Sequence, residues 1–268
     1  MLIAVLSAKG APGVTTAALA LALSWPRPVV LAELDPAGGD VLAGYGRGEQ
    51  AADGLGELSL AARRGDVIAR LDAHLLQLDQ AGRARLLPGL ADPTGAAHVD
   101  WSRMAGALDA IGDGTTDVLA DCGRLRTEHF PTPVVSQAAA VVVVTGSNLR
   151  AVRAASQAIA HLRREEAEPG TGPVAVMVVA PGEPYTEREI GDALAVPVIG
   201  ALPRDAKTAA VLSDGAPAGR GFAQTALMRA AQSVAADLVA FSASRQAVLA
   251  PAWSASADPV DSAGPIRG

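Results

Sequence analysis

The stretch Ser7–Thr16, with the sequence SAKGAPGVTT, decides the fold that we expect for this chain. It follows the apolar run Leu2–Leu6 and precedes an alanine-rich helical pattern from Ala17 to Trp25. A strand, a glycine-containing turn and a helix in this order are typical of a phosphate-binding loop, because the free N–H groups and the positive dipole end of the helix favour an anion. The other interpretation is a strand-to-helix turn without a ligand.

The loop departs from the regular pattern G-x-x-x-x-G-K-[ST] at two positions. Ala8 stands at the first glycine, and Val14 stands where a lysine normally holds the phosphates. Gly13 remains for close approach of the backbone, and Thr15 offers a hydroxyl group to Mg²⁺. Lys9 is the cation inside the loop, in a chain whose 22 basic residues include only two lysines. A lysine kept at this place favours a role that arginine does not fill.

The composition favours a soluble α/β protein. Half of the 268 residues are hydrophobic but only 3% are aromatic, so the core consists mainly of Ala, Val and Leu, which suits helices packed closely on a parallel sheet. The formal charge of −6 and the scattered arginines provide no basic stripe for DNA. The single Cys122 excludes an intramolecular disulfide, and no apolar run is long enough to span a bilayer. We expect a cytoplasmic protein.

Two acidic motifs follow runs that are typical of buried strands. The run 28–33 leads into Asp35, and the run 116–120 ends at Asp121. Parallel strands present their carboxyl ends at one edge of a sheet, where doubly wound folds bind ligands. Carboxylates at this edge can hold the waters of a nucleotide-bound Mg²⁺. We therefore predict a metal site of Thr15, Asp35 and Asp121, in which Asp121 supports the metal and Asp35 orients an attacking water; the alternative for Asp35 is an ordinary Asp-Pro turn.

The rest of the chain continues to alternate between strand and helix patterns. We predict a doubly wound, mostly parallel sheet with helices on both faces. Further strands are predicted at 84–90, 138–145, 173–180 and 197–205, and further helices at 55–64, 100–111, 146–164, 187–194, 206–213 and 221–244, with 68–78 either helical or irregular. We expect one domain over 1–247 and a disordered tail, rich in Pro, Ser, Ala and Gly, over 248–268.

In this order the motifs resemble those of the ParA/MinD superfamily of ATPases, which carry a deviant Walker A loop. The family's usual loop is K-G-G-x-G-K-T-T, and this chain departs from it at Ala11 and Val14. The loop positions that match are Lys9, Gly10, Gly13, Thr15 and Thr16. The later motifs that resemble the family's D-x-D-P-x-G, D-x-[PG] and P-x-D are Glu33–Gly38, Asp121–Gly123 and Pro203–Asp205.

The resemblance implies ATP and Mg²⁺ as cofactors. It implies that Lys9 reaches across a nucleotide-sandwiched homodimer and acts with Asp35 in catalysis. The residues that it implies for nucleotide binding are Lys9, Gly10, Ala11, Pro12, Gly13, Val14, Thr15, Thr16, Pro203 and Asp205. Ala180 and Pro181 stand where family members commonly have Asn-Arg, whose asparagine contacts adenine. The basic amphipathic tip that anchors MinD proteins to membranes has no counterpart near the C-terminal end.

Three functional hypotheses follow. The favoured one is a nucleotide-dependent dimeric switch that works with a protein partner in subcellular positioning, partitioning, pilus or secretion systems. Its ATP hydrolysis is expected to be weak because Val14 replaces the lysine, unless Lys9 or an arginine substitutes. The second is a scaffold that does not hydrolyse ATP, as in the atypical TadZ/CpaE-like pilus-localisation branch. The third is a metabolic enzyme on the same fold, such as the dethiobiotin synthetase-like relatives, for which the sequence offers no substrate-binding constellation.

Overall fold

The computed structural model describes residues 1–9, 13–48, 54–65, 67–112, 115–165, 172–182 and 184–249. Three residues of the predicted phosphate-binding loop, Gly10, Ala11 and Pro12, lie outside the described residues, as does the predicted tail from residue 250 onward.

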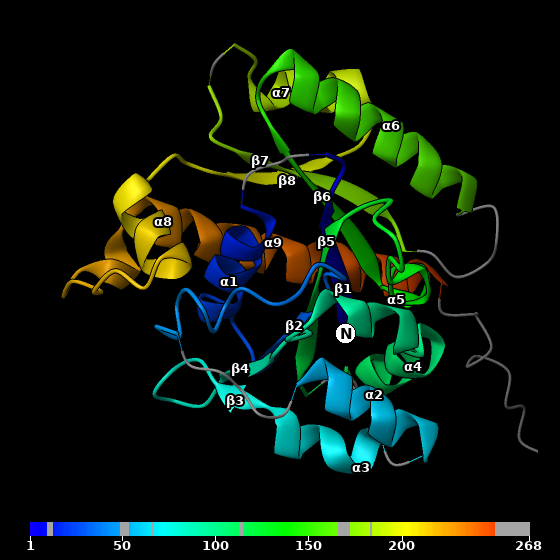
Figure 1. Ribbon diagram of the computed structural model, residues 1–268. Coiled ribbons are helices and arrows are strands. Elements are labelled where there is room, and N and C mark those ends of the chain that lie inside the picture. Colours follow the sequence, from blue (N-terminus) through cyan, green and yellow to red (C-terminus); the bar gives the residue numbers. More distant parts are fainter. Residues whose placement is uncertain are drawn as a thin grey trace, which may run out of the picture.

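The described chain forms one eight-stranded sheet with the order β3-β4-β2-β5-β1-β6-β7-β8 (Figure 1). The strands are β1 (Leu2–Ser7), β2 (Val29–Glu33), β3 (Leu76–Gln77), β4 (Ala84–Leu87), β5 (Asp117–Arg124), β6 (Ala140–Gly146), β7 (Val174–Val179) and β8 (Val198–Leu202). Every neighbouring pair is parallel except β3 with β4. The central strands β1, β5 and β6 are mainly apolar and buried along most of their length, as helix-covered parallel strands require.

Helices cover both faces of this sheet (Figure 1). One face packs against α1 (Val14–Leu23), α8 (Ala206–Ser213) and α9 (Ala226–Leu249). The other packs against α2 (Leu55–Arg63), α3 (Val67–Leu71), α4 (Trp101–Ile111), α5 (Thr132–Gln137), α6 (Leu149–Glu165) and α7 (Glu187–Leu194). Three short 3₁₀ helices lie at Asp72–His74, Pro93–His98 and Phe222–Gln224. The predicted doubly wound, mostly parallel α/β fold is confirmed.

Some element boundaries differ from the predicted ones. Helix α1 begins three residues before Ala17, because Gly13 already provides the turn at its N-terminus. Helix α9 begins at Ala226 rather than at 221, after a 3₁₀ turn, where the Thr225 hydroxyl accepts a hydrogen bond from the Met228 N–H at 3.4 Å. The six-residue α5 was not predicted, since it is too short to produce a helical period.

The strand order brings the predicted acidic motifs together. Strand β5 lies between β1 and β2, and Asp121 pairs in register with Val5 on one side and with Glu33 on the other. All three strands are parallel, so their carboxyl ends meet at one edge, which also carries the start of α1.

Candidate functional site

The first turn of α1 is open to an incoming group. Gly13, the residue before the helix, has the left-handed dihedral angles φ 83° and ψ 34°, and no side chain caps this end of α1. The Ala17 N–H donates the first helical hydrogen bond to the Gly13 carbonyl at 2.8 Å, which leaves the preceding N–H groups without helical partners. A helix N-terminus of this kind favours an anion.

Val14 provides no cation at this helix start. Its side chain is only 7% exposed and belongs to the apolar cluster that α1 shares with β1, α8 and α9. Lys9 is exposed at the end of β1. The described loop therefore offers backbone donors to an anion, with one lysine at its rim.

Thr15 lies beside Asp121, and its hydroxyl group lowers the pKa of that carboxylate as a hydrogen-bond partner. Asp121 is 1% exposed, and its Oδ1 also accepts a hydrogen bond from the Gly123 N–H at 3.0 Å. The pKa of Asp121 is raised to about 7, mainly by burial and also by the negative charges of Glu33 and Asp35, while Thr15 and the Gly123 N–H oppose this change. A nearby cation would stabilise the charged form of such a buried carboxylate.

Asp35 lies in the loop after β2 and against Gly123. A Cβ atom at position 123 would overlap the Asp35 carboxyl group, and Gly123 has a left-handed φ of 62°. The Ala37 N–H donates to Asp35 Oδ1 at 2.8 Å. Burial raises the pKa of Asp35, and the negative charge of Asp40 adds to this, while the Ala37 hydrogen bond and the positive charge of Arg124 lower it. The structure thus brings the two predicted acidic motifs to one place.

A cavity of about 670 Å³ connects the start of α1 with these acidic motifs. It is bounded by the ends of β1 and β5, the first turn of α1, the loop after β2 and the end of α8. Its lining residues are Ser7, Gly13, Val14, Thr15, Thr16, Asp35, Asp40, Val41, Ala43, Gly44, Gly123, Arg124, Leu212, Ser213 and Asp214. Lys9, Asp121, Pro203 and Asp205 do not line it.

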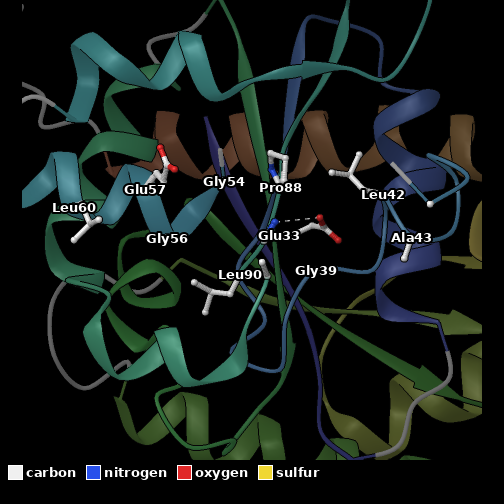
Figure 2. A pocket seen from close by; sticks show the side chains of 13 residues that line it. Glu33, Gly39, Leu42, Ala43, Gly54, Gly56, Glu57, Leu60, Pro88 and Leu90 are labelled. Atoms are coloured by element: carbon white, nitrogen blue, oxygen red, sulfur yellow. Dashed lines mark hydrogen bonds between the residues drawn. The ribbon is translucent and has the colours of Figure 1, made fainter. Parts of the chain in front are cut away.

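Glu33 holds the loop that contains Asp35 in place. Its Oε1 accepts hydrogen bonds from the N–H groups of Asp40 and Val41, both at 2.8 Å. Its Oε2 accepts a hydrogen bond from the Gly89 N–H at 3.2 Å (Figure 2). Burial is the largest cause of its raised pKa, and these three bonds oppose it. Glu33 faces a second cavity, of about 690 Å³, beside the first. This positioning role was not apparent from the sequence, where Glu33 occupies the first acidic position of D-x-D.

Asp205 caps α8. Its carboxylate accepts hydrogen bonds from the Thr208 N–H at 3.1 Å and from the Thr208 hydroxyl at 2.7 Å, and these bonds lower its pKa. Pro203 is partly buried two residues earlier. The opposite end of the same helix, at Ser213, lines the cavity. A nucleotide-binding role for Pro203 and Asp205 stays a prediction.

Oxygen donors in the cavity and next to it fit Mg²⁺. Thr15 contributes a hydroxyl group, and Asp35 and Asp121 contribute carboxylates, which are ligands that Mg²⁺ prefers directly or through water. Within the described ranges no group of three or more His, Cys, Asp or Glu side chains is arranged to hold a metal ion. The open end of α1 fits a phosphate group, and the glycine at position 13 permits its close approach.

Comparison with known proteins gives matches among solved structures. No protein-family model and no curated protein matches the chain. A ParA family ATPase from Chlorobium tepidum superposes with a TM-score of 0.72 at 19% identity, over 88% of this chain and 98% of that one. MinD from Pyrococcus horikoshii, complexed with Mg-ADP, gives 0.69 at 18% identity, over 88% and 95%. The MinC:MinD complex from Aquifex aeolicus gives 0.64 at 18% identity, over 89% and 96%.

The chain has the ParA/MinD fold. At identities below 20%, these superpositions establish the architecture alone. The chemistry of the site follows from the residues of this chain. In this fold, three of the predicted site residues lie close together: Thr15, Asp35 and Asp121.

Sequence reasoning missed Arg124, which lines the cavity. The signal was present in Asp121–Arg124, because a glycine near the end of a strand that carries a functional acid often marks a bulge. The end of α8, at Leu212 and Ser213, was also missed, since nothing local predicts that a helix C-terminus will reach this cavity.

Proposed function

We propose that this chain binds Mg²⁺–ATP in the cavity at the start of α1 and works as a nucleotide-dependent dimeric switch with weak ATP hydrolysis. The observation that carries the proposal is that Thr15, at the helix start, lies beside the buried Asp121. This pair joins a phosphate-binding element to a metal-supporting carboxylate, and Asp35, which lines the same cavity as Thr15, is close enough for its charge to act on Asp121. The cytoplasm is the expected location. No helix within the described ranges has both the length and the apolar character of a membrane span.

Each described residue has a separate task in this proposal. The N–H groups of the first turn of α1 bind phosphate oxygens. Thr15 and Asp121 hold Mg²⁺, which when bound supplies positive charge that offsets the charge of the phosphates. Asp35 accepts a hydrogen bond from the attacking water and orients it, while Glu33 fixes the loop on which Asp35 lies.

The switch acts through association of two copies and a protein partner. Lys9 is exposed at the rim of the loop and is free to extend toward a second copy, as the resemblance to the family implies. One structural neighbour is a complex of MinD with MinC, so a protein partner in a positioning or partitioning system is the corresponding role here. The formal charge of −6 does not favour DNA as that partner.

A scaffold that does not hydrolyse ATP is the second candidate, and Val14 favours it. The side chain at this position is buried in the apolar core, so the charge-assisted hydrogen bonds of the usual lysine are lost. Each such bond contributes about 1.5–3 kcal/mol, which corresponds to roughly one to two orders of magnitude in affinity. The backbone donors and the oxygen ligands for Mg²⁺ remain, which is why we favour weak hydrolysis over none.

Titration calorimetry with Mg²⁺–ATP, Mg²⁺–ADP and adenosine tests binding, and light scattering with each nucleotide tests dimerisation. We expect measurable affinity for both nucleotides, negligible affinity for adenosine and dimers with ATP only. Single-turnover hydrolysis then separates the two candidates: a slow but Asp35-dependent rate supports the switch, whereas binding without turnover supports the scaffold. Absence of binding to either nucleotide would refute both nucleotide-based functions.

A further inference from the structure

Negatively charged side chains outnumber positively charged ones in the cavity at the start of α1. Three carboxylates line it, those of Asp35, Asp40 and Asp214. Val14 is apolar, and the undescribed loop positions 10–12 are Gly, Ala and Pro, which carry no charged side chain. A triphosphate in this cavity would therefore need a cation from a position other than 14, in addition to Mg²⁺.

Arg124 is the one cation among the described residues that line this cavity. It is the last residue of β5 and pairs in register with Ser7, the last residue of β1. The adjacent Leu125 N–H donates to the Ser7 carbonyl at 2.8 Å, which fixes the backbone beside Arg124 at the point where the phosphate-binding loop begins.

A bulge in β5 places Arg124 there. Val5 pairs with Asp121 but Ser7 pairs with Arg124, so β5 contains one more residue than β1 over this interval. Strict alternation would turn Arg124 to the same face as Cys122, which packs in the core under α4 and α5. The extra residue and the left-handed φ of 62° at Gly123 change the direction of the strand end, and Gly123 and Arg124 both line the cavity.

The guanidinium group of Arg124 is available to a ligand. The side chain is exposed, and within the described ranges it donates no hydrogen bond and forms no ion pair. Its positive charge acts on Asp35, whose pKa it lowers. A guanidinium group carries five N–H donors in a planar arrangement that matches two phosphate oxygens at once.

We propose that Arg124 takes the place of the lysine missing at position 14 and binds the phosphate groups of the nucleotide through charge-assisted hydrogen bonds. The inference rests on the proposed nucleotide binding and assigns the residue that makes it possible. It also explains how Val14 can be buried in the core of a chain that keeps Thr15, Asp35 and Asp121 together: the cation of the site has moved from the helix to the neighbouring strand.

The test is calorimetric titration of Arg124→Gln, Arg124→Lys and the matched control Arg126→Gln. Arg126 is exposed in the same loop but does not line the cavity, so its substitution removes one charge without removing the contact. The probes are Mg²⁺–ATP, Mg²⁺–tripolyphosphate and adenosine. We expect Arg124→Gln to lower the affinity for both phosphate-containing probes about ten-fold or more. The affinity of Arg124→Lys should fall between that of Arg124→Gln and that of the parent, and Arg126→Gln should bind as the parent does.

The outcomes separate the inference from the proposed function. A parent chain that binds neither Mg²⁺–ATP nor tripolyphosphate refutes both. If the parent binds these probes, the role of Arg124 is refuted when Arg124→Gln has the same affinity as the parent, or when Arg124→Gln and Arg126→Gln lose affinity equally. Either result leaves nucleotide binding itself intact. Thermal unfolding of the three variants without ligand checks that they are folded, and because Arg124 is exposed we expect their melting temperatures to match the parent's.

Discussion

The carboxyl group of Asp35 occupies the space that a side chain at Gly123 would fill. The loop after β2 and the bulge at the end of β5 therefore fit together only while position 123 has no Cβ atom. Because Asp35 and Arg124 line the cavity from these two segments, the contact at Gly123 sets the shape of the site.

Gly123→Ala should displace Asp35 and disturb the cavity. The left-handed φ of Gly123 adds backbone strain of roughly 1 kcal/mol for a residue with a Cβ atom, and the overlap with Asp35 adds to it. Gly48→Ala is the matched control, since Gly48 has a φ of 83° but no atom within 4 Å of the added Cβ. Chemical denaturation and nucleotide affinity are measured for both; equal losses of stability and affinity in the two variants would contradict the role of the contact.

Asp121→Ala and Asp35→Ala should have different effects. Asp121 is buried against Thr15, so its loss should weaken Mg²⁺–ATP binding itself by about ten-fold or more. Asp35 is in the loop, so its loss should leave binding nearly unchanged, remove single-turnover hydrolysis and prolong any ATP-bound dimer. The measurements are affinity and single-turnover rate beside the parent. Equal, negligible effects would mean that the carboxylates are scaffolding and that the chain works without nucleotide.

The protonation of Asp121 should make both stability and metal binding depend on pH. Its pKa is about 7 in the folded chain and near 3.8 when unfolded, so the folded state binds one proton more between these values and stability falls as pH rises through this window. Mg²⁺ needs the charged form, so affinity for Mg²⁺–ATP should rise with pH up to about 7. Denaturation and titration of Asp121→Asn from pH 5 to 8 should give a flatter stability profile; an unchanged profile would contradict the assignment.

Val14→Lys should tighten ATP binding if the helix start has kept its shape, because the open N-terminus and Gly13 are already in place. The aliphatic stem of lysine can stay in the apolar cluster while its charged end reaches the cavity that Val14 lines. Val14→Met has a similar stem without charge and is the control. We expect titration to show a higher affinity for ATP in Val14→Lys than in Val14→Met. Equal affinities would mean that the loop has lost its phosphate-binding shape, and Ala8 and Pro12 are the first residues to test for the cause.

Lys9→Ala should abolish ATP-dependent dimerisation while leaving the fold intact. The side chain is exposed, so little stability depends on it, and Val14 offers no interaction with phosphate at the other loop position. Lys207→Ala is the matched control, because Lys207 is the other lysine and is exposed on α8. Light scattering with and without Mg²⁺–ATP measures the effect. A Lys9→Ala protein that still dimerises as the parent does would favour the scaffold.

Local sequence determined most of the architecture. Apolar runs such as Leu2–Leu6 and Val29–Ala32 are hydrophobic without alternation, which is the pattern of strands covered by helices on both faces, and such strands are parallel. Parallel strands share one carboxyl edge, so Asp35, which follows β2, and Asp121, in the second half of β5, had to lie near the loop that follows β1. The proximity of Thr15, Asp35 and Asp121 was predictable for this reason, and their roles stay predictions.

Tertiary structure decided what the individual side chains do. The bulge after Asp121 aims Arg124 at the cavity, and its position depends on how β5 pairs with β1. Glu33 was expected near the site, but its carboxylate is used by the N–H groups of Asp40, Val41 and Gly89, which come from two other segments. Strand and helix patterns arise from repeated, local burial of apolar groups, whereas the direction of one polar side chain depends on a few contacts between segments distant in the sequence, and only the folded chain brings those contacts together.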